Sequence, residues 1–234
     1  MMKQIIILFF LMSLLLQCQT KNEPMPTTDF YISEQKITYK NQDLPFGKPV
    51  EDWVKIFGKY SRRPFKSIYV WDKLGIHISE SDESEDIDEL HIFFMNLDSP
   101  LAEEGVLDFA EGYYMNTDKN PKNYEYPYTI YTKPINVEGA EVKQGMKISE
   151  INKERESKDL EPISYIDANM NGKVEQGPEE EANGYFSNYG AKNNPQQQRE
   201  EEKKNFYHIM FRQTSGEVEY IRIVQDKGQE YFKY

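Results

Sequence analysis

Cysteine is nearly absent from this chain, and the short motifs that mark the commonest catalytic sites are missing altogether. A single cysteine excludes a disulfide framework, and the three histidines lack the close spacing typical of a metal centre. The sequence contains no Gly-x-Ser-x-Gly elbow, no phosphate-binding glycine loop and no His-Glu-x-x-His motif. We therefore predict a protein that is not an enzyme, with no catalytic residue and no cofactor.

Positive charge is scarce as well. The chain has 28 lysine and arginine residues against 40 aspartate and glutamate residues, a formal net charge of -12. Nucleic acid and anionic lipid surfaces repel such a chain, so we expect no nucleic-acid partner. The acidity leaves three interpretations open, namely a basic protein partner, a cation, or solubility alone.

The long apolar run near the N-terminus, residues 5–16, is too short to span a bilayer comfortably and is typical of a secretory signal. No small-x-small cleavage site follows it, and the next stretch, LLLQCQT, holds the only cysteine. This stretch resembles the lipobox of bacterial lipoproteins, although Gln17 stands where that family has a small residue. The resemblance implies that Cys18 is lipidated and becomes the first mature residue. An uncleaved membrane anchor is the alternative.

A pattern in the body of the chain occurs twice, first from Ile37 and again, 98 residues later, from Ile135. Each copy has a short alternating strand, then a glycine (Gly47 or Gly145), then apolar residues three apart, which predict a short helix. Strand-like runs follow each helix, at 67–72, 74–79 and 89–96 and at 162–168, 205–213 and 217–225. We expect an α+β fold of two tandem units, each a strand and short helix followed by an antiparallel sheet.

The expected organisation follows from these patterns. Its parts are a lipoprotein signal peptide (1–17), a lipid-anchored flexible tether (18–28), a first α+β unit (29–111), a tyrosine-rich linker (112–132) and a second unit (133–234) with a polar insertion at about 175–204.

Two stretches of the first unit, LPFGKP at 44–49 and YVWDKLGI at 69–76, are similar to an uncharacterised family of bacterial envelope lipoproteins. The unit as a whole resembles the helix-plus-sheet units of outer-membrane assembly lipoproteins and of β-lactamase inhibitor proteins, and the latter contain two units in tandem. The resemblance implies a binding or scaffolding module.

An acidic segment, 79–89, lies between two predicted strands and should form a projecting hairpin loop. As in the inhibitors that the unit resembles, such a loop could enter a groove of a basic partner. The predicted contact residues are Glu80, Asp82, Glu83, Glu85 and Asp86. The alternative is a solvated loop whose like charges repel one another.

The three histidines alternate with apolar neighbours in predicted strands. If helices cover the apolar side, His77, His91 and His208 share the opposite sheet face with aromatic and methionine residues that include Phe93, and that face is a candidate protein-binding surface. The predicted contact residues on it are His91, Phe93 and His208. Zinc binding and half-exposed strand histidines are the alternatives, and no close sequence spacing supports zinc.

The stretch DANMNG has the oxygen-ligand spacing of a calcium loop, with Asp167, Asn169 and Asn171 at its first, third and fifth positions. Pro178 stands where such a loop needs a glutamate, and the flanking runs predict strands. A hairpin closed by the turn pair Asn171-Gly172 is therefore the competing interpretation.

Together these features predict a lipid-anchored protein of the bacterial cell envelope, at the outer membrane, with a non-enzymatic protein-binding role. Its partners would be the membrane, through the lipid, and a protein of unknown identity. The acidic loop favours an inhibitor or immunity protein, and the resemblance favours an accessory of envelope assembly. A weak cation- or glycan-binding lipoprotein is the alternative.

Overall fold

The computed structural model describes residues 28–81, 84–95, 126–165, 184–187, 206–214 and 216–226. The predictions for the signal peptide, Cys18 and the calcium ligands Asp167, Asn169 and Asn171 lie outside these residues. Of the expected polar insertion at about 175–204, only residues 184–187 are described, and they form a strand that pairs with residues 210–213. Within the described part of the chain, no helix is long and apolar enough to cross a membrane.

A five-stranded sheet combines short strands from both halves of the chain. Its order is β10-β9-β1-β2-β3, and β1 pairs antiparallel with β2 and parallel with β9. The strands are β1 (Phe30–Ile32), β2 (Ile37–Tyr39), β3 (Gln42–Asp43), β9 (Ile135–Val137) and β10 (Ala140–Val142). The β1–β9 pair is the point at which the N-terminal strand joins the two halves.

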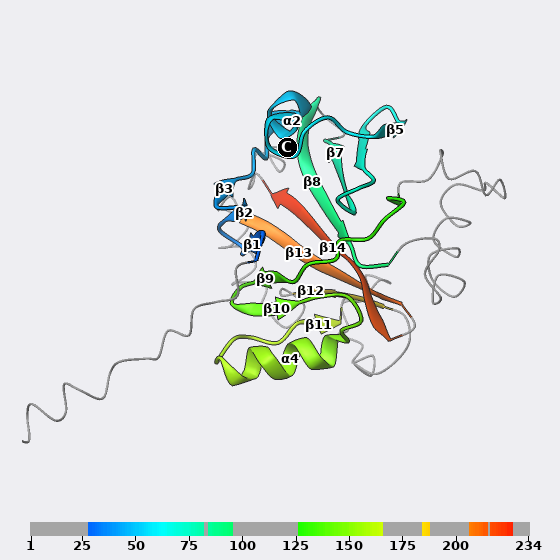
Figure 1. Ribbon diagram of the computed structural model, residues 1–234. Coiled ribbons are helices and arrows are strands. Elements are labelled where there is room, and N and C mark those ends of the chain that lie inside the picture. The colour runs from blue at the N-terminus through cyan, green and yellow to red at the C-terminus, as the bar shows by residue number, and fades with distance from the viewer. Residues whose placement is uncertain are drawn as a thin grey trace, which may run out of the picture.

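A second, nine-stranded sheet is antiparallel throughout and has the order β11-β12-β13-β14-β8-β7-β6-β5, with β4 paired to β8. Its strands are β4 (Lys48–Pro49), β5 (Arg62–Phe65), β6 (Ile68–Trp71), β7 (Ile76–Glu80), β8 (Asp86–Phe93), β11 (Ser164–Tyr165), β12 (Gly184–Ser187), β13 (Phe206–Thr214) and β14 (Glu217–Asp226). The long strands β8, β13 and β14 cross the middle of the molecule (Figure 1).

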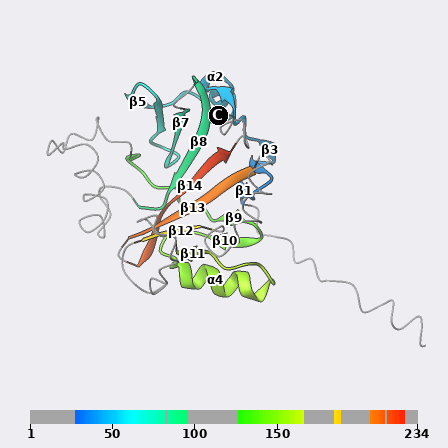
Figure 2. The same ribbon diagram turned by 180° about the vertical axis from the view of Figure 1, so that it is seen from behind.

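Two described helices, α2 (Val50–Phe57) and α4 (Ile148–Ser157), lie at opposite ends of the molecule (Figures 1 and 2). Pro49 precedes α2, where its missing N–H costs no hydrogen bond, and Gly58 ends the helix with a φ of 78°. In α4, the buried Asn152 side chain exchanges two hydrogen bonds with the backbone of Ile163, at 2.7 and 2.9 Å. These bonds fix the chain that leaves α4 against the helix.

Strand alternation gives the larger sheet two different faces. One face is aliphatic and aromatic, and its buried residues form a single cluster with the smaller sheet and both helices. That cluster includes Trp53 of α2, Ile151 of α4 and Phe30 of β1. The expected α+β fold with mainly antiparallel sheets is therefore confirmed.

Residues 126–131, which we call the strap, cross the ends of β7 and β8. The Tyr131 N–H donates to the carbonyl of Phe93 at 2.7 Å, and the Phe93 N–H donates to the carbonyl of Gly75 at 2.9 Å. A Cβ atom at position 75 would lie 2.2 Å from the Tyr131 nitrogen, and Gly75 has a φ of +68°. Only glycine therefore lets the strap pass this close.

We expect Gly75→Ala to lower the free energy of unfolding by at least about 3 kcal/mol, because the clash adds to the cost of a left-handed backbone. Gly216→Ala is the matched control, since Gly216 has a φ of +84° and no atom within 4 Å of an added Cβ. The control should lose only about 1–2 kcal/mol. Urea unfolding of both variants measures the difference, and equal losses would contradict the role assigned to the strap.

Candidate functional site

The acidic hairpin is only partly available for contact with a partner. The Glu80 carboxylate accepts a hydrogen bond from the Tyr69 hydroxyl and pairs with Arg63 at 3.2 Å, and its side chain is 10% exposed. Burial, followed by the nearby Glu80 carboxylate, raises the pKa of Tyr69. Glu80 therefore stabilises the fold.

Two of the other predicted contact residues of this hairpin are described. Glu85 is exposed, whereas Asp86 pairs in register with Pro49 of β4. Asp82 and Glu83 lie outside the described residues.

The histidine face exists, but two of its predicted contact residues are buried. His91 is 9% and Phe93 is 1% exposed, and the ring of Tyr126 in the strap lies 4.9 Å from the ring of Phe93. A partner therefore cannot reach Phe93 in this conformation. His208 is half-buried on β13, where it pairs with Val224 of β14.

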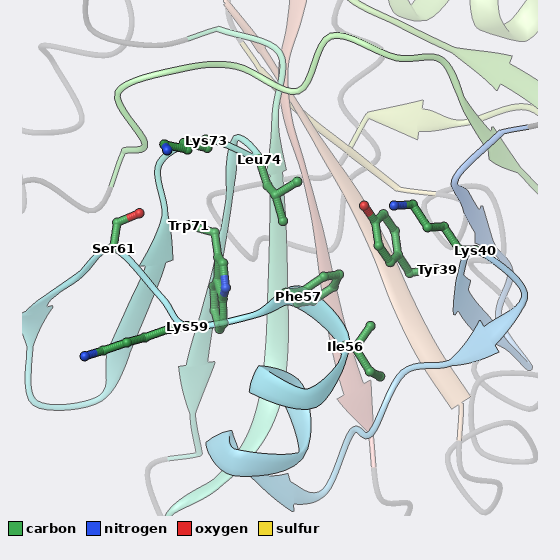
Figure 3. Close-up of a pocket in the computed structure, with 9 residues that line it drawn as sticks. All are labelled: Tyr39, Lys40, Ile56, Phe57, Lys59, Ser61, Trp71, Lys73 and Leu74. Carbon is green, nitrogen blue, oxygen red and sulfur yellow. The ribbon is translucent and has the colours of Figure 1, made fainter.

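An open pocket of about 360 Å³ lies where α2 ends, and sequence reasoning did not identify it. Three separate segments build it, namely the β2–β3 turn, the end of α2 with the chain that follows, and the β6–β7 turn (Figure 3). Its lining consists of Tyr39, Lys40, Ile56, Phe57, Lys59, Ser61, Trp71, Lys73 and Leu74.

Packed aromatic rings form the floor of this pocket. The ring of Phe57 lies 5.0 Å from that of Tyr39 and 5.6 Å from that of Trp71, both in edge-to-face geometry. The Trp71 indole N–H donates to the carbonyl of Gly58 at 2.8 Å, which fixes the indole against the end of α2. The floor is thus preformed and apolar.

Three exposed lysines, Lys40, Lys59 and Lys73, belong to the lining of the pocket (Figure 3). The Lys40 ammonium lies 5.0 Å from the centroid of the Tyr39 ring. Among the described residues, no carboxylate forms an ion pair with any of the three lysines. The arrangement suits a ligand that combines negative charge with an apolar group. We call it the lysine pocket.

A buried ion pair holds one wall of the lysine pocket. The Arg62 Nε lies 3.1 Å from both carboxylate oxygens of Asp72, and the two side chains are 13% and 10% exposed. The same carboxylate accepts the Tyr128 N–H of the strap at 2.9 Å, and Ser61 accepts the Asp72 N–H at 3.1 Å. Asp72 therefore connects the strap to the two segments of the chain that carry Lys59 and Lys73.

Fold and pocket together define an α+β protein with a preformed aromatic pocket rimmed by lysines. The chain belongs to a family described as a domain of unknown function (DUF7738), whose family model matches residues 29–152. No curated protein and no solved structure matches this chain. The matched range contains every residue of the lysine pocket and the whole strap.

We expect Arg62→Met to lower the free energy of unfolding by about 3–5 kcal/mol, because it leaves the buried Asp72 carboxylate without its cation. Lys36→Met is the control, since the side chains of the Lys36–Asp43 pair are 57% and 74% exposed. The control should cost at most about 1 kcal/mol. Denaturant unfolding of both variants tests this, and equal costs would exclude a structural role for the Arg62–Asp72 pair.

Proposed function

We propose that this protein is a lipid-anchored cell-envelope protein that binds another protein without catalysing a reaction. Its contact site is the lysine pocket, and its partner presents an acidic segment with an apolar or aromatic side chain at its centre. The observation that carries the proposal is a group of three exposed lysines beside an aromatic floor, none of which forms an ion pair with a carboxylate of the described residues, on a chain whose formal net charge is -12. Local positive charge on an acidic protein selects partners by charge complementarity.

We propose further that the body consists of two tandem α+β units. The helices begin at Val50 and Ile148, 98 residues apart, which is the offset of the repeated sequence pattern. The preceding hairpin turns match as well, since positive φ angles occur at Lys40 and Asn41 and again at Glu138 and Gly139.

Contacts between strands also repeat at the offset of 98 residues. Lys48 pairs with Ile87 in β8, and Met146, 98 residues after Lys48, accepts a hydrogen bond from Val218 in β14. In both halves an antiparallel meander follows the helix, β5 to β8 in the first and β11 to β14 in the second. This correspondence supports the resemblance to two-unit inhibitors and assembly lipoproteins.

The protein-binding role leaves two subclasses, an inhibitor or immunity protein and an accessory of envelope assembly. The lysine pocket favours the first, because three charges around one cavity suit a single specific partner. Glycan binding is a second candidate, favoured by the partly exposed Phe57 ring in the pocket, since aromatic rings also stack on sugars.

Lipidation at Cys18 is tested directly by labelling with a fatty acid. Cys18→Ser should leave an unprocessed precursor that takes up no label, because the thiol is the acceptor of the lipid. Electrophoresis of the membrane fraction measures the size of the chain, and autoradiography of the same gel measures uptake of the labelled fatty acid. A variant that is still labelled and cleaved would refute the lipoprotein assignment.

Partner binding is tested by changing the charge of the pocket. The chain from Gln19 onward is immobilised and exposed to native envelope and secreted fractions, and retained proteins are identified by mass spectrometry. We expect one dominant partner with an acidic segment, retained by the wild type and lost when Lys40, Lys59 and Lys73 are changed to Glu. The dissociation constant of that partner should rise at least ~100-fold in the triple variant.

The matched control changes three other exposed lysines, Lys48, Lys66 and Lys153, to Glu and so has the same net charge. It should retain the partner.

A second column with Glu85→Gln and Asp86→Asn tests the acidic hairpin separately. Loss of the partner from the pocket variant and the control alike, or retention by both, would contradict binding at the lysine pocket. Retention of glycan in place of protein would favour the second candidate.

A further inference from the structure

Three potential metal ligands converge on the face of the larger sheet opposite to the lysine pocket. In the β7–β8 hairpin, His77 pairs directly with His91, and Glu89 lies two residues before His91 on β8. Cross-strand partners and residues two apart on a strand point to the same face, so all three side chains share it. One potential ligand atom from each of the three residues lies within 4.8 Å of the other two.

The contacts inside this cluster place three electron-pair donors around one point. His77 Nε2 lies 2.7 Å and Glu89 Oε1 lies 3.2 Å from His91 Nδ1. A neutral imidazole nitrogen either donates or accepts a hydrogen bond, so the contact between the two imidazoles uses one proton, and any hydrogen bond to Glu89 must share that proton. A divalent cation among them would accept electron pairs from all three.

Burial, followed by the positive charge of Arg222, holds the pKa of His91 well below its usual range.

Arg222 of β14 orients the carboxylate from outside the cluster. Its Nη2 lies 2.6 Å from Glu89 Oε2, which leaves Oε1 directed toward His91. Outer-shell hydrogen bonds of this kind fix the orientation of ligating carboxylates. The side chain of Arg222 is 41% exposed, whereas His77 and His91 are 2% and 9% exposed. The arginine also opposes the charge of a cation, which limits the affinity.

We propose that His77, Glu89 and His91 form a binding site for a divalent transition metal, with zinc as the best match. Two imidazole nitrogens and one carboxylate oxygen are a common zinc ligand set that leaves a fourth position open. Tetrahedral zinc separates two nitrogen ligands by about 3.3 Å. The two imidazoles must therefore move apart by about half an ångström from their hydrogen-bonded spacing when the ion binds.

The two sites are independent of each other. Val70 pairs with His77, whereas Trp71, a pocket residue, pairs with Ile76, so the pocket residue and the histidine lie on opposite faces of the sheet. Zinc binding is therefore separable from the partner binding proposed above.

The test titrates zinc chloride into the full chain, purified in detergent with Cys18→Ser so that its thiol cannot bind zinc. Competition with a chromophoric zinc indicator measures the affinity and the stoichiometry. We expect one zinc per chain and a loss of affinity of at least ~100-fold in each of His77→Gln, His91→Gln and Glu89→Gln. With Co²⁺ in place of zinc, the visible absorption of four-coordinate cobalt should appear in the wild type and vanish in these variants.

The matched control is His208→Gln, because His208 lies on the same sheet face and pairs with Val224, the β14 partner of Glu89. It should keep the wild-type affinity within about threefold. Glu89→Gln keeps the shape of the side chain, so it decides the test if a histidine variant fails to fold. Binding weaker than about 10 μM by the wild type, or wild-type affinity in Glu89→Gln, would overturn the proposal.

Discussion

The antiparallel pairing of β8 with β14 is the interaction on which the rest of the structure depends. It places Ile92 opposite Ile221 and Leu90 opposite Ile223, so the apolar residues of both halves of the chain fall on one face. A shift of one residue would turn these side chains to the other face. The pairing also removes the free edge that each half of the larger sheet would otherwise present. The two halves therefore share one core.

The same alternation that builds the core assigns the two proposed sites to opposite sides of the sheet. On the core side, α2 packs with the hairpin of the smaller sheet, and the lysine pocket forms where these elements meet the β6–β7 turn. On the other side, His77, His91 and Arg222 occupy one row across three strands. The strap lies at the end of β7 and β8, where Asp72 and Gly75 hold it.

Local structure was largely predictable from the sequence. The helices at Val50–Phe57 and Ile148–Ser157 follow from apolar residues three apart, and the strands β6, β7, β8, β13 and β14 follow from strand-like runs of residues. The predicted run at 89–96 was three residues late, since β8 spans Asp86–Phe93. Alternation also placed the three histidines on one face. These features depend on residues close in sequence, for which periodicity is a direct physical signal.

Long-range pairing and burial were not predictable in the same way. The parallel β1–β9 pair joins segments far apart in the sequence, and no local pattern specifies it. The burial of Phe93 depends on Tyr126, which the sequence analysis assigned to a linker. Lys40, Lys59 and Lys73 lie in three separate segments, namely the β2–β3 turn, the chain after α2 and the β6–β7 turn. Only the fold therefore brings them to one cavity.

The proximity of the proposed metal ligands, His77, Glu89 and His91, depends on strand register. His77 and His91 are 14 residues apart, and only the register of the β7–β8 hairpin brings their rings into contact. A hairpin turn of different length would separate them, and the acidic residues of the turn gave no signal of its geometry. The sequence spacing therefore argued against zinc, whereas the spatial arrangement favours it.

Hydrogen exchange along β8 and β14 tests the central claim most directly, namely that these two strands join the halves into one cooperative body. Native-state exchange is measured residue by residue at increasing concentrations of denaturant. If the pairing unites the fold, the hydrogen-bonded amides of both strands will exchange only through global unfolding, at one common free energy. Exchange of β14 at a clearly lower free energy than β8 would mean that the halves open separately, and it would contradict this account.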